Sequence, residues 1–176
     1  MIVVRPASLP RDAEAIGRLD TAFTTSAVYD VVASDVAITM TLRALAQPLI
    51  KRFPLDDLTS PQRPYDHAWA AWDGERCVGF AATSYEPWNR RLTLWHLYVD
   101  PAHRRQGIAR QLLKSVEPHG QAHGARHLWL ETSSLNVPGV AAYRALGFSL
   151  TGADLTLYDG TDAEGETALF FSRPIS

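Results

Sequence analysis

Residues 92–113, LTLWHLYVDPAHRRQGIARQLL, predict an apolar strand, a short basic loop and a helix that begins beside a glycine. Gly107 has no side chain and Ala109 has only a methyl group, so a ligand can approach the backbone N–H groups that a helix leaves unpaired at its first turn. The helix dipole favours negative charge there, and three arginines add positive charge: Arg104, Arg105 and Arg110. The segment therefore predicts an anion site, although a glycine that only shapes the turn is equally consistent with it.

The rest of the chain alternates between strand-like and helix-like patterns. Strands are expected at residues 2–5, 67–72, 76–85, 92–99 and 128–131, and near 149–158 and 166–172. A first helix is expected to begin near Asp12, with apolar residues at helical spacing: Ala13, Ile16, Leu19 and Phe23. A second is expected at 108–116, followed by Pro118 and Gly120, which disturb or end it, and a third at about 137–146. This alternation predicts a single α/β domain over residues 1–176.

Four shorter stretches complete this picture. Asp73-Gly74 predicts a tight hairpin turn, and Asp159-Gly160 predicts the last turn of the chain. Residues 28–43 suggest two strands, although LRALAQ at 42–47 is equally consistent with a short helix. The proline-containing residues 53–65 predict a surface loop, either a plain connector or a lid over a substrate.

Composition excludes several functional classes. With 176 residues, of which 46% are hydrophobic and 20% charged, the chain suits one soluble domain with a substantial core. A net charge of −2 argues against a nucleic-acid partner or an anionic membrane. The lone Cys77 cannot form an intramolecular disulfide and is expected to be buried rather than nucleophilic. No apolar N-terminal run resembles a signal peptide, so a cytoplasmic location is expected. The six histidines show no H-E-x-x-H or comparable ligand pattern, so no metal site is expected.

Two motifs connect these features to a known family. Residues 104–109 read R-x-x-G-x-A, which resembles the pyrophosphate-binding signature of the GNAT N-acetyltransferases. In residues 128–148 an asparagine follows a strand, a tyrosine comes seven residues later and a G-F pair follows, as in that family: Asn136, Tyr143 and Gly147-Phe148. Two motifs in the right order are more specific than either alone.

Within that family the chain is most similar to the streptothricin acetyltransferases. The matching positions are Trp88-Asn89, Leu130-Glu131-Thr132, Asn136-Val137, Gly152, Asp154 and Tyr158. The resemblance covers roughly residues 65–173, whereas Thr24 to Arg63 carries no motif that can be placed.

The resemblance implies a GNAT-like fold, with a mixed, mostly antiparallel central sheet flanked by helices, and acetyl-CoA as the acetyl donor. It implies that the backbone of Leu97, Tyr98 and Val99 pairs with the pantetheine arm and that the Val99 N–H stabilises the oxyanion. The pyrophosphate would be held by Arg104, Arg105, Gln106, Gly107, Ile108, Ala109 and Arg110. Tyr143 would protonate the departing sulfur, and Asn136, followed by Pro138, could cap a helix, contact the cofactor, or do both.

The general base and the acceptor site stay open at this stage. The imidazole of His96 suits proton exchange near neutral pH, so His96 is a candidate general base, although it is equally consistent with a core residue. Glu131 is a comparably plausible base, and a water chain to the solvent is the third alternative. Acceptor binding would use Glu86, Trp88, Asp154 and Tyr158, although Glu86 also fits an ordinary surface carboxylate and the aromatic residues also fit the core.

These observations predict an acetyl-CoA-dependent N-acetyltransferase that acts on a small cationic amine, with streptothricin-type antibiotics, and hence antibiotic resistance, as one candidate. The alternatives are acetylation of a peptide or protein amine, a noncatalytic acyl-CoA sensor, and a nucleotide-phosphate-binding protein, which would explain only the first motif. The expected partners are a small-molecule amine, with no nucleic acid or membrane, for a monomer or homodimer.

Overall fold

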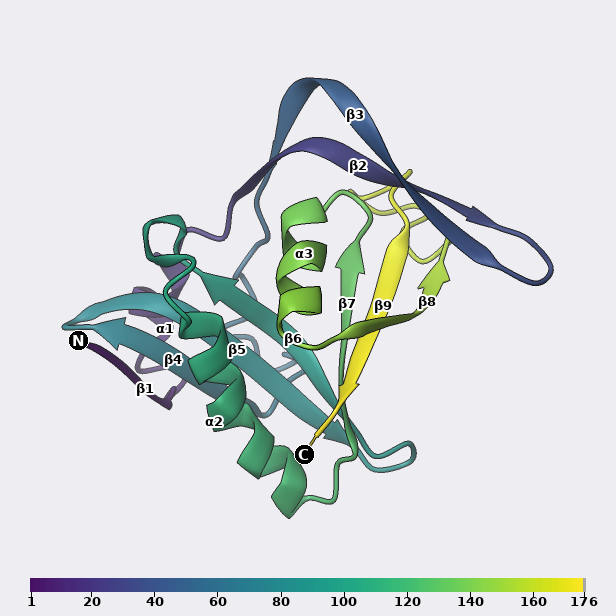
Figure 1. Cartoon of the computed structure of the whole chain (residues 1–176). Coiled ribbons are helices and arrows are strands. Elements are labelled where there is room, and N and C mark those ends of the chain that lie inside the picture. Colours follow the sequence, from purple (N-terminus) through teal and green to yellow (C-terminus); the bar gives the residue numbers. More distant parts are fainter. Residues whose placement is uncertain (176) are drawn as a thin grey trace. The chain divides into compact units, whose positions relative to one another are not determined.

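Two units make up the chain in the computed structural model, which describes residues 1–175 (Figure 1). The first unit contains residues 1–22, residues 52–128 and the C-terminal end from Pro174, and the second contains residues 23–51 and 129–173. The predicted single domain over residues 1–176 stays a prediction.

In the first unit, four antiparallel strands lie in the order β1-β4-β5-β6: β1 (Ile2–Pro6), β4 (His67–Asp73), β5 (Arg76–Glu86) and β6 (Arg91–Val99). All four predicted strands are confirmed. Gly74, with a φ of 59°, supplies the left-handed conformation of the predicted β4–β5 turn. Ala82 of β5 pairs with His96 of β6, but the next residue, Thr83, pairs with Leu94. The register therefore shifts at this point, and Trp95 is an extra residue in β6.

The helices of this unit differ from the prediction in length. Helix α1 covers only Ala13–Gly17, and Phe23 belongs to the following strand, so the helical spacing predicted up to Phe23 is wrong. A short 3₁₀ helix, η1 (Pro101–His103), precedes α2 (Ile108–Ala122).

Helix α2 also continues through Pro118 and Gly120, where an end was predicted. The buried residues Leu112, Leu113 and Val116 hold it on the unit's core, which outweighs the loss of one backbone hydrogen bond at Pro118. At Gly120 a Cβ would lie 2.8 Å from Leu92 Cδ2, so the glycine allows close packing instead of ending the helix.

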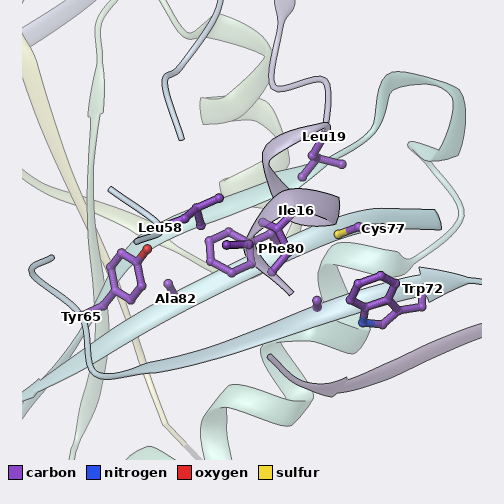
Figure 2. Packing of buried hydrophobic residues seen from close by; sticks show 10 residues of the cluster. Ile16, Leu19, Leu58, Tyr65, Trp72, Cys77, Phe80 and Ala82 are labelled. Atoms are coloured by element: carbon purple, nitrogen blue, oxygen red, sulfur yellow. The ribbon is translucent and has the colours of Figure 1, made fainter. Parts of the chain in front are cut away.

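Buried side chains from α1, from β4 and β5 and from residues 52–66 form one hydrophobic cluster (Figure 2). Leu58 and Tyr65 lie in this cluster beside Ile16 and Phe80, so the prediction of a plain surface loop over residues 53–65 is wrong for these two residues. Cys77 is buried, as predicted, and burial raises the pKa of its thiol to about 11.

The second unit contains two strand groups and one helix. Strands β2 (Phe23–Ala33) and β3 (Ile38–Lys51) pair as a long antiparallel hairpin, so LRALAQ is part of a strand rather than a helix. The remaining strands, in the order β7-β9-β8, are β7 (His127–Ser133), β9 (Ala168–Pro174) and β8 (Ser149–Asp154), and α3 covers Val137–Ala145. Tyr158 lies after β8 rather than inside the strand predicted at 149–158.

Together these elements confirm the predicted fold class, a mixed α/β fold with a mostly antiparallel central sheet flanked by helices. None of the helices within residues 1–175 has the length and apolar character needed to cross a membrane.

Candidate active site

The loop between β6 and α2 is shaped by Gly107 at the start of the helix. Gly107 is the N-cap residue of α2 and has a φ of 80°, a left-handed conformation that side-chain-bearing residues rarely adopt. A Cβ built on Gly107 would meet no other atom within 4 Å, so the space beside the backbone is open. The first N–H groups of an α-helix have no intrahelical acceptor. This arrangement fits a phosphate group.

Asp100 fixes the beginning of the same loop. Its buried carboxylate accepts hydrogen bonds from the backbone N–H of Ala102 at 3.0 Å and from Arg76 Nη2 at 2.8 Å, and it lies 3.2 Å from His103 Nδ1. Burial on its own would raise the pKa of Asp100, but these hydrogen bonds together lower it. The carboxylate therefore stays charged and holds the loop in one conformation.

The arginines of the loop have different environments. Arg104 Nε donates to the Val99 carbonyl at 3.0 Å, and its Nη2 donates to the Ala22 carbonyl at 2.6 Å, so this guanidinium anchors the loop to the backbone. Arg105 and Arg110 have exposed side chains at the start of α2. Arg105 is therefore better placed than Arg104 to meet a ligand.

His96 pairs with an aspartate that sequence reasoning missed. His96 Nε2 lies 2.8 Å from Asp57 Oδ2, its Nδ1 lies 3.5 Å from the Tyr98 hydroxyl, and its side chain is 11% exposed. The Tyr65 hydroxyl also donates to Asp57, at 3.3 Å. Burial raises the pKa of Tyr65, which keeps this donor protonated. Both nitrogens of His96 thus face partners within the first unit, and the imidazole links residues 52–66 to β6.

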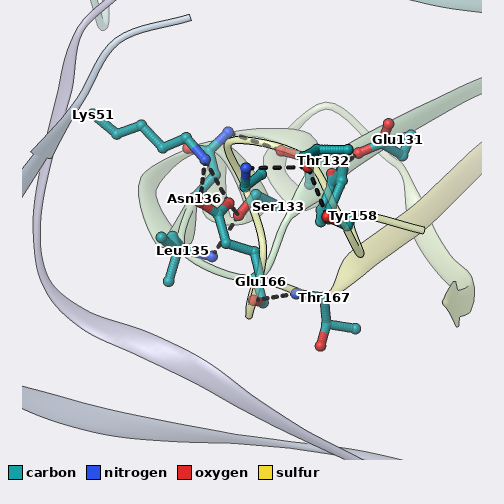
Figure 3. A network of polar contacts seen from close by, with 12 residues as sticks. Lys51, Glu131, Thr132, Ser133, Leu135, Asn136, Tyr158, Glu166 and Thr167 are labelled. Carbon is teal, nitrogen blue, oxygen red and sulfur yellow. Dashed lines mark hydrogen bonds and ion pairs between the residues drawn. The ribbon is translucent and has the colours of Figure 1, made fainter. Parts of the chain in front are cut away.

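In the second unit, Asn136 organises the start of α3. Its Oδ1 accepts from the Gly139 N–H at 3.0 Å, which confirms the predicted helix cap, and its Nδ2 donates to Thr132 Oγ1 at 2.9 Å (Figure 3). The Thr132 side chain in turn hydrogen-bonds Tyr143. Asn136 and Tyr143, two of the predicted site residues, are therefore connected through Thr132.

Tyr143 lies on α3, and its hydroxyl is protonated at neutral pH. Burial raises the pKa of Tyr143 to about 12, although the Thr132 hydrogen bond acts in the opposite direction. Its ring packs near Phe148 and Phe171, with centroid distances of 6.0 and 6.2 Å. Packing and hydrogen bonding hold a neutral phenol, which is a proton donor, in a defined position.

Glu131 and Tyr158, another predicted pair, are in direct contact. The Tyr158 hydroxyl, from the loop after β8, donates a hydrogen bond to Glu131 at the end of β7 (Figure 3). Burial raises the pKa of the Glu131 carboxyl, and the hydrogen bond from Tyr158 partly offsets that effect. A carboxylate with a raised pKa is a stronger base than an ordinary one.

A second polar network beside this pair contains residues that sequence reasoning did not identify. Lys51 forms an ion pair with Glu166, whose side chain is 12% exposed, and Glu166 also accepts a hydrogen bond from Ser133 (Figure 3). Ser134 Oγ accepts from the Thr167 N–H at 3.1 Å. These contacts link β3, β7 and the segment before β9.

The remaining predicted residues lie at the edges of their units. In the first unit, Glu86 accepts from Ser84 Oγ at 3.2 Å, and Trp88 is 84% exposed, which excludes a core role for that indole. In the second unit, Asp154 accepts from the backbone N–H and the hydroxyl of Thr156, at 2.8 and 2.9 Å. These bonds lower the pKa of Asp154, whose carboxylate stabilises its own turn.

Comparison with known proteins agrees with this geometry. The sequence profile of the acetyltransferase (GNAT) family matches residues 40–148. The chain is 40% identical to streptothricin acetyltransferase of Streptomyces lavendulae over 173 residues, 94% of this chain and 91% of that protein. It is 36% identical to the [ribosomal protein bS18]-alanine N-acetyltransferase of Escherichia coli over 84 residues, 48% of this chain and 56% of that protein.

Solved structures give the same result. The crystal structure of nourseothricin acetyltransferase superposes with a TM-score of 0.87 at 40% identity, over 99% of both chains. A Bacillus anthracis protein crystallised in complex with acetyl coenzyme A shares the fold, with a TM-score of 0.82 at 20% identity over 99% of both chains. The chain therefore belongs to the GNAT family of N-acetyltransferases, which use acetyl-CoA as the acetyl donor.

Proposed function

We propose that this enzyme transfers an acetyl group from acetyl-CoA to a primary amine of a small cationic acceptor of the streptothricin type. The observation that carries this proposal is the extent of the similarity to streptothricin acetyltransferase, which covers 94% of this chain. In sequence, the relative that acetylates a ribosomal protein matches only 48% of this chain. Similarity that extends beyond the segment shared by both relatives favours the small-molecule acceptor.

Acetyl-CoA would be held chiefly by backbone groups of the first unit. The open space at Gly107 and the N-terminus of α2 would hold the pyrophosphate, with support from Arg105 and Arg110. Arg104, through Val99 and Ala22, would keep the loop in place. The backbone of Leu97, Tyr98 and Val99 is proposed to pair with the pantetheine arm, with the Val99 N–H facing the thioester oxygen.

Acetyl-CoA supplies a thioester whose carbonyl carbon a neutral amine can attack. A bond forms between the amine nitrogen and that carbon, the carbon–sulfur bond breaks, the nitrogen loses a proton and the sulfur gains one. We assign the donated proton to Tyr143, because its pKa of about 12 keeps the phenol protonated and Thr132 holds it.

We assign the proton of the amine to Glu131 rather than to His96. The pKa of Glu131 is raised, so its carboxylate can receive a proton from an incoming acceptor. His96 is nearly buried, and both of its nitrogens face partners, which favours a positioning role. A water chain stays the alternative route for this proton.

Glu86, Trp88, Asp154 and Tyr158 stay our proposed acceptor-binding residues. Tyr158 has the strongest support, because it already contacts Glu131. The exposed indole of Trp88 could cover an apolar part of the acceptor, and the carboxylates of Glu86 and Asp154 could pair with its positive charge.

The test is an acetylation assay with purified protein, acetyl-CoA and a panel of amines. The panel contains streptothricin, free lysine, a polyamine and a peptide with an N-terminal alanine. With streptothricin we expect the release of free CoA and, by mass spectrometry, the gain of one acetyl group. The kcat/KM for streptothricin should be far higher than that for the peptide. A preference for the peptide would overturn the proposed acceptor and favour the peptide amine instead.

A further inference from the structure

Three histidines and an aspartate gather in the first unit, away from the loop at Gly107. Asp66 and His67 lie at the start of β4, and His119 and His123 lie one turn apart at the end of α2. The His119 ring is 3.6 Å from the His67 ring and 4.4 Å from the His123 ring, measured between centroids. Possible ligand atoms of Asp66, His67 and His119 all lie within 4.8 Å of one another.

Existing hydrogen bonds fix the proton positions on two of these rings. His123 Nδ1 lies 2.9 Å from the His119 carbonyl, and because a carbonyl only accepts, Nδ1 carries the hydrogen and Nε2 has a lone pair. His67 Nδ1 lies 2.9 Å from Asp66 Oδ1, and the same reasoning leaves a lone pair on His67 Nε2. A carbonyl or carboxylate behind each ring is the arrangement that orients histidines toward a metal ion.

His119 supplies the second, independent observation. Its Nε2 is buried and has no hydrogen-bond partner among residues 1–175, although buried polar atoms are almost always paired. This unpaired nitrogen is therefore available to a ligand that enters the cluster.

We propose that a Zn²⁺ ion binds to Nε2 of His67 and Nε2 of His119, with Asp66 holding His67 in position. The exposed His123, whose ring centroid is 6.2 Å from that of His67, turns toward the ion and gives the third ligand through its Nε2. Three imidazoles suit zinc and similar transition metals, whereas Mg²⁺ prefers oxygen ligands. The side chains of Asp66 and His67 are 64% and 44% exposed, so the ion can reach the site and the rings can adjust to it. The ion would join the start of β4 to the end of α2.

The sequence does contain a signal for this site. His119 and His123 are four residues apart, a spacing that places two imidazoles on one face of a helix. The expectation of no metal considered H-E-x-x-H, which residues 119–123 (H-G-Q-A-H) match in the spacing of the histidines but not in the glutamate. It could not anticipate His67, which lies 52 residues before His119 along the chain (119 − 67) and approaches it only in the folded unit.

The test is calorimetric titration of Zn²⁺ into untagged, chelator-treated full-length protein, with Mg²⁺ titrated in parallel. We expect one Zn²⁺ per chain with a Kd of about 1 μM or tighter and no comparable Mg²⁺ binding. His119→Gln should weaken Zn²⁺ binding more than ~100-fold, and Asp66→Asn should weaken it ~10–100-fold. The matched control is His127→Gln, which removes an exposed histidine outside the cluster and should leave the affinity unchanged.

Further measurements distinguish a loss of metal binding from a loss of folding. Circular dichroism without metal checks each variant, and His67→Gln, at an exposed position, serves if His119→Gln does not fold. Co²⁺ gives a further readout, because a site with three histidines should produce visible absorption that both histidine variants lose. Absence of Zn²⁺ binding, or equal affinity in wild type, His119→Gln and His67→Gln, would overturn the proposal. The acetylation assay plays no part in it, so the two proposals fail independently.

Discussion

A substitution at Tyr143 distinguishes the chemical step from the binding of acetyl-CoA most clearly. Tyr143→Phe removes the proton donor but keeps the ring beside Phe148 and Phe171. We expect kcat to fall ~10–1000-fold, with acetyl-CoA affinity nearly unchanged. Release of CoA measures the first quantity and calorimetry the second. Tyr29→Phe, on β2 of the same unit, is the control. Full turnover in Tyr143→Phe would remove this residue from the reaction.

Glu131 makes the pH dependence of the reaction a test of the general base. A base works only when deprotonated, so the raised pKa of Glu131 predicts that kcat/KM falls as the pH drops through that value. Glu131→Gln should lower kcat and flatten this acidic limb, since glutamine does not titrate.

The comparison variant is His96→Gln, measured over the same pH range. It should lower stability, because Asp57 loses the imidazole and keeps only the Tyr65 hydroxyl, while the acidic limb keeps its shape. If His96→Gln flattens the limb and Glu131→Gln does not, the base assignment is reversed.

Among the elements, the loop between β6 and α2 allows a test with a closely matched control. Gly107 and Gly160 have φ values of 80° and 72°, and a Cβ built on either meets no atom within 4 Å. Replacing either by tryptophan therefore introduces similar backbone strain, of about 1–2 kcal/mol. Only Gly107→Trp places a bulky ring where the pyrophosphate is proposed to bind.

We expect Gly107→Trp to weaken acetyl-CoA binding at least ~100-fold, since the ring would block the helix N-terminus. Gly160→Trp should bind acetyl-CoA like the wild type and show a similar loss of thermal stability. Calorimetric titration and thermal unfolding give both quantities. Equal acetyl-CoA affinity in the two folded variants would place the anion elsewhere.

How well each element could be predicted depends on how local its determinants are. The β4–β5 hairpin follows from apolar runs around Asp73-Gly74, and the cap of α3 follows from Asn136, because both signals involve neighbouring residues. The end of α2 was mispredicted, because packing against the core outweighs the local effects of Pro118 and Gly120.

The same reasoning explains which polar residues sequence analysis missed. The His96–Asp57 pair spans 39 positions and the Lys51–Glu166 pair spans 115, so neither leaves a local pattern. Residues that belong to a family motif, such as Asn136 and Glu131, were found because the motif encodes their spacing. Residues particular to this chain, such as Asp57, become visible only through tertiary contacts.

For the molecule as a whole, the stability of the fold at low pH depends on carboxylates that accept hydrogen bonds in the folded state. Asp12 is 7% exposed and accepts hydrogen bonds from Arg5 Nη1 at 2.8 Å, from Arg5 Nη2 at 3.1 Å and from the Ser8 N–H at 2.9 Å. The hydrogen bonds from Arg5 are the largest cause of the lowered pKa of Asp12. The pKa of Asp100 is also lowered.

A carboxylate whose pKa is lower in the folded state stabilises that state fully above its unfolded pKa of about 3.9, and this contribution disappears as the pH falls through the folded value. The free energy of unfolding should therefore decline steeply in acid. Asp12→Asn should lower it by roughly 1–3 kcal/mol at neutral pH, because charged hydrogen bonds with Arg5 are lost, and should also make its decline in acid shallower. Urea unfolding at a series of pH values measures both effects, and Asp162→Asn, at an exposed position, is the control. If Asp12→Asn and wild type lose stability with the same slope, the acid sensitivity arises from other carboxylates, and Asp100→Asn is the next variant to measure.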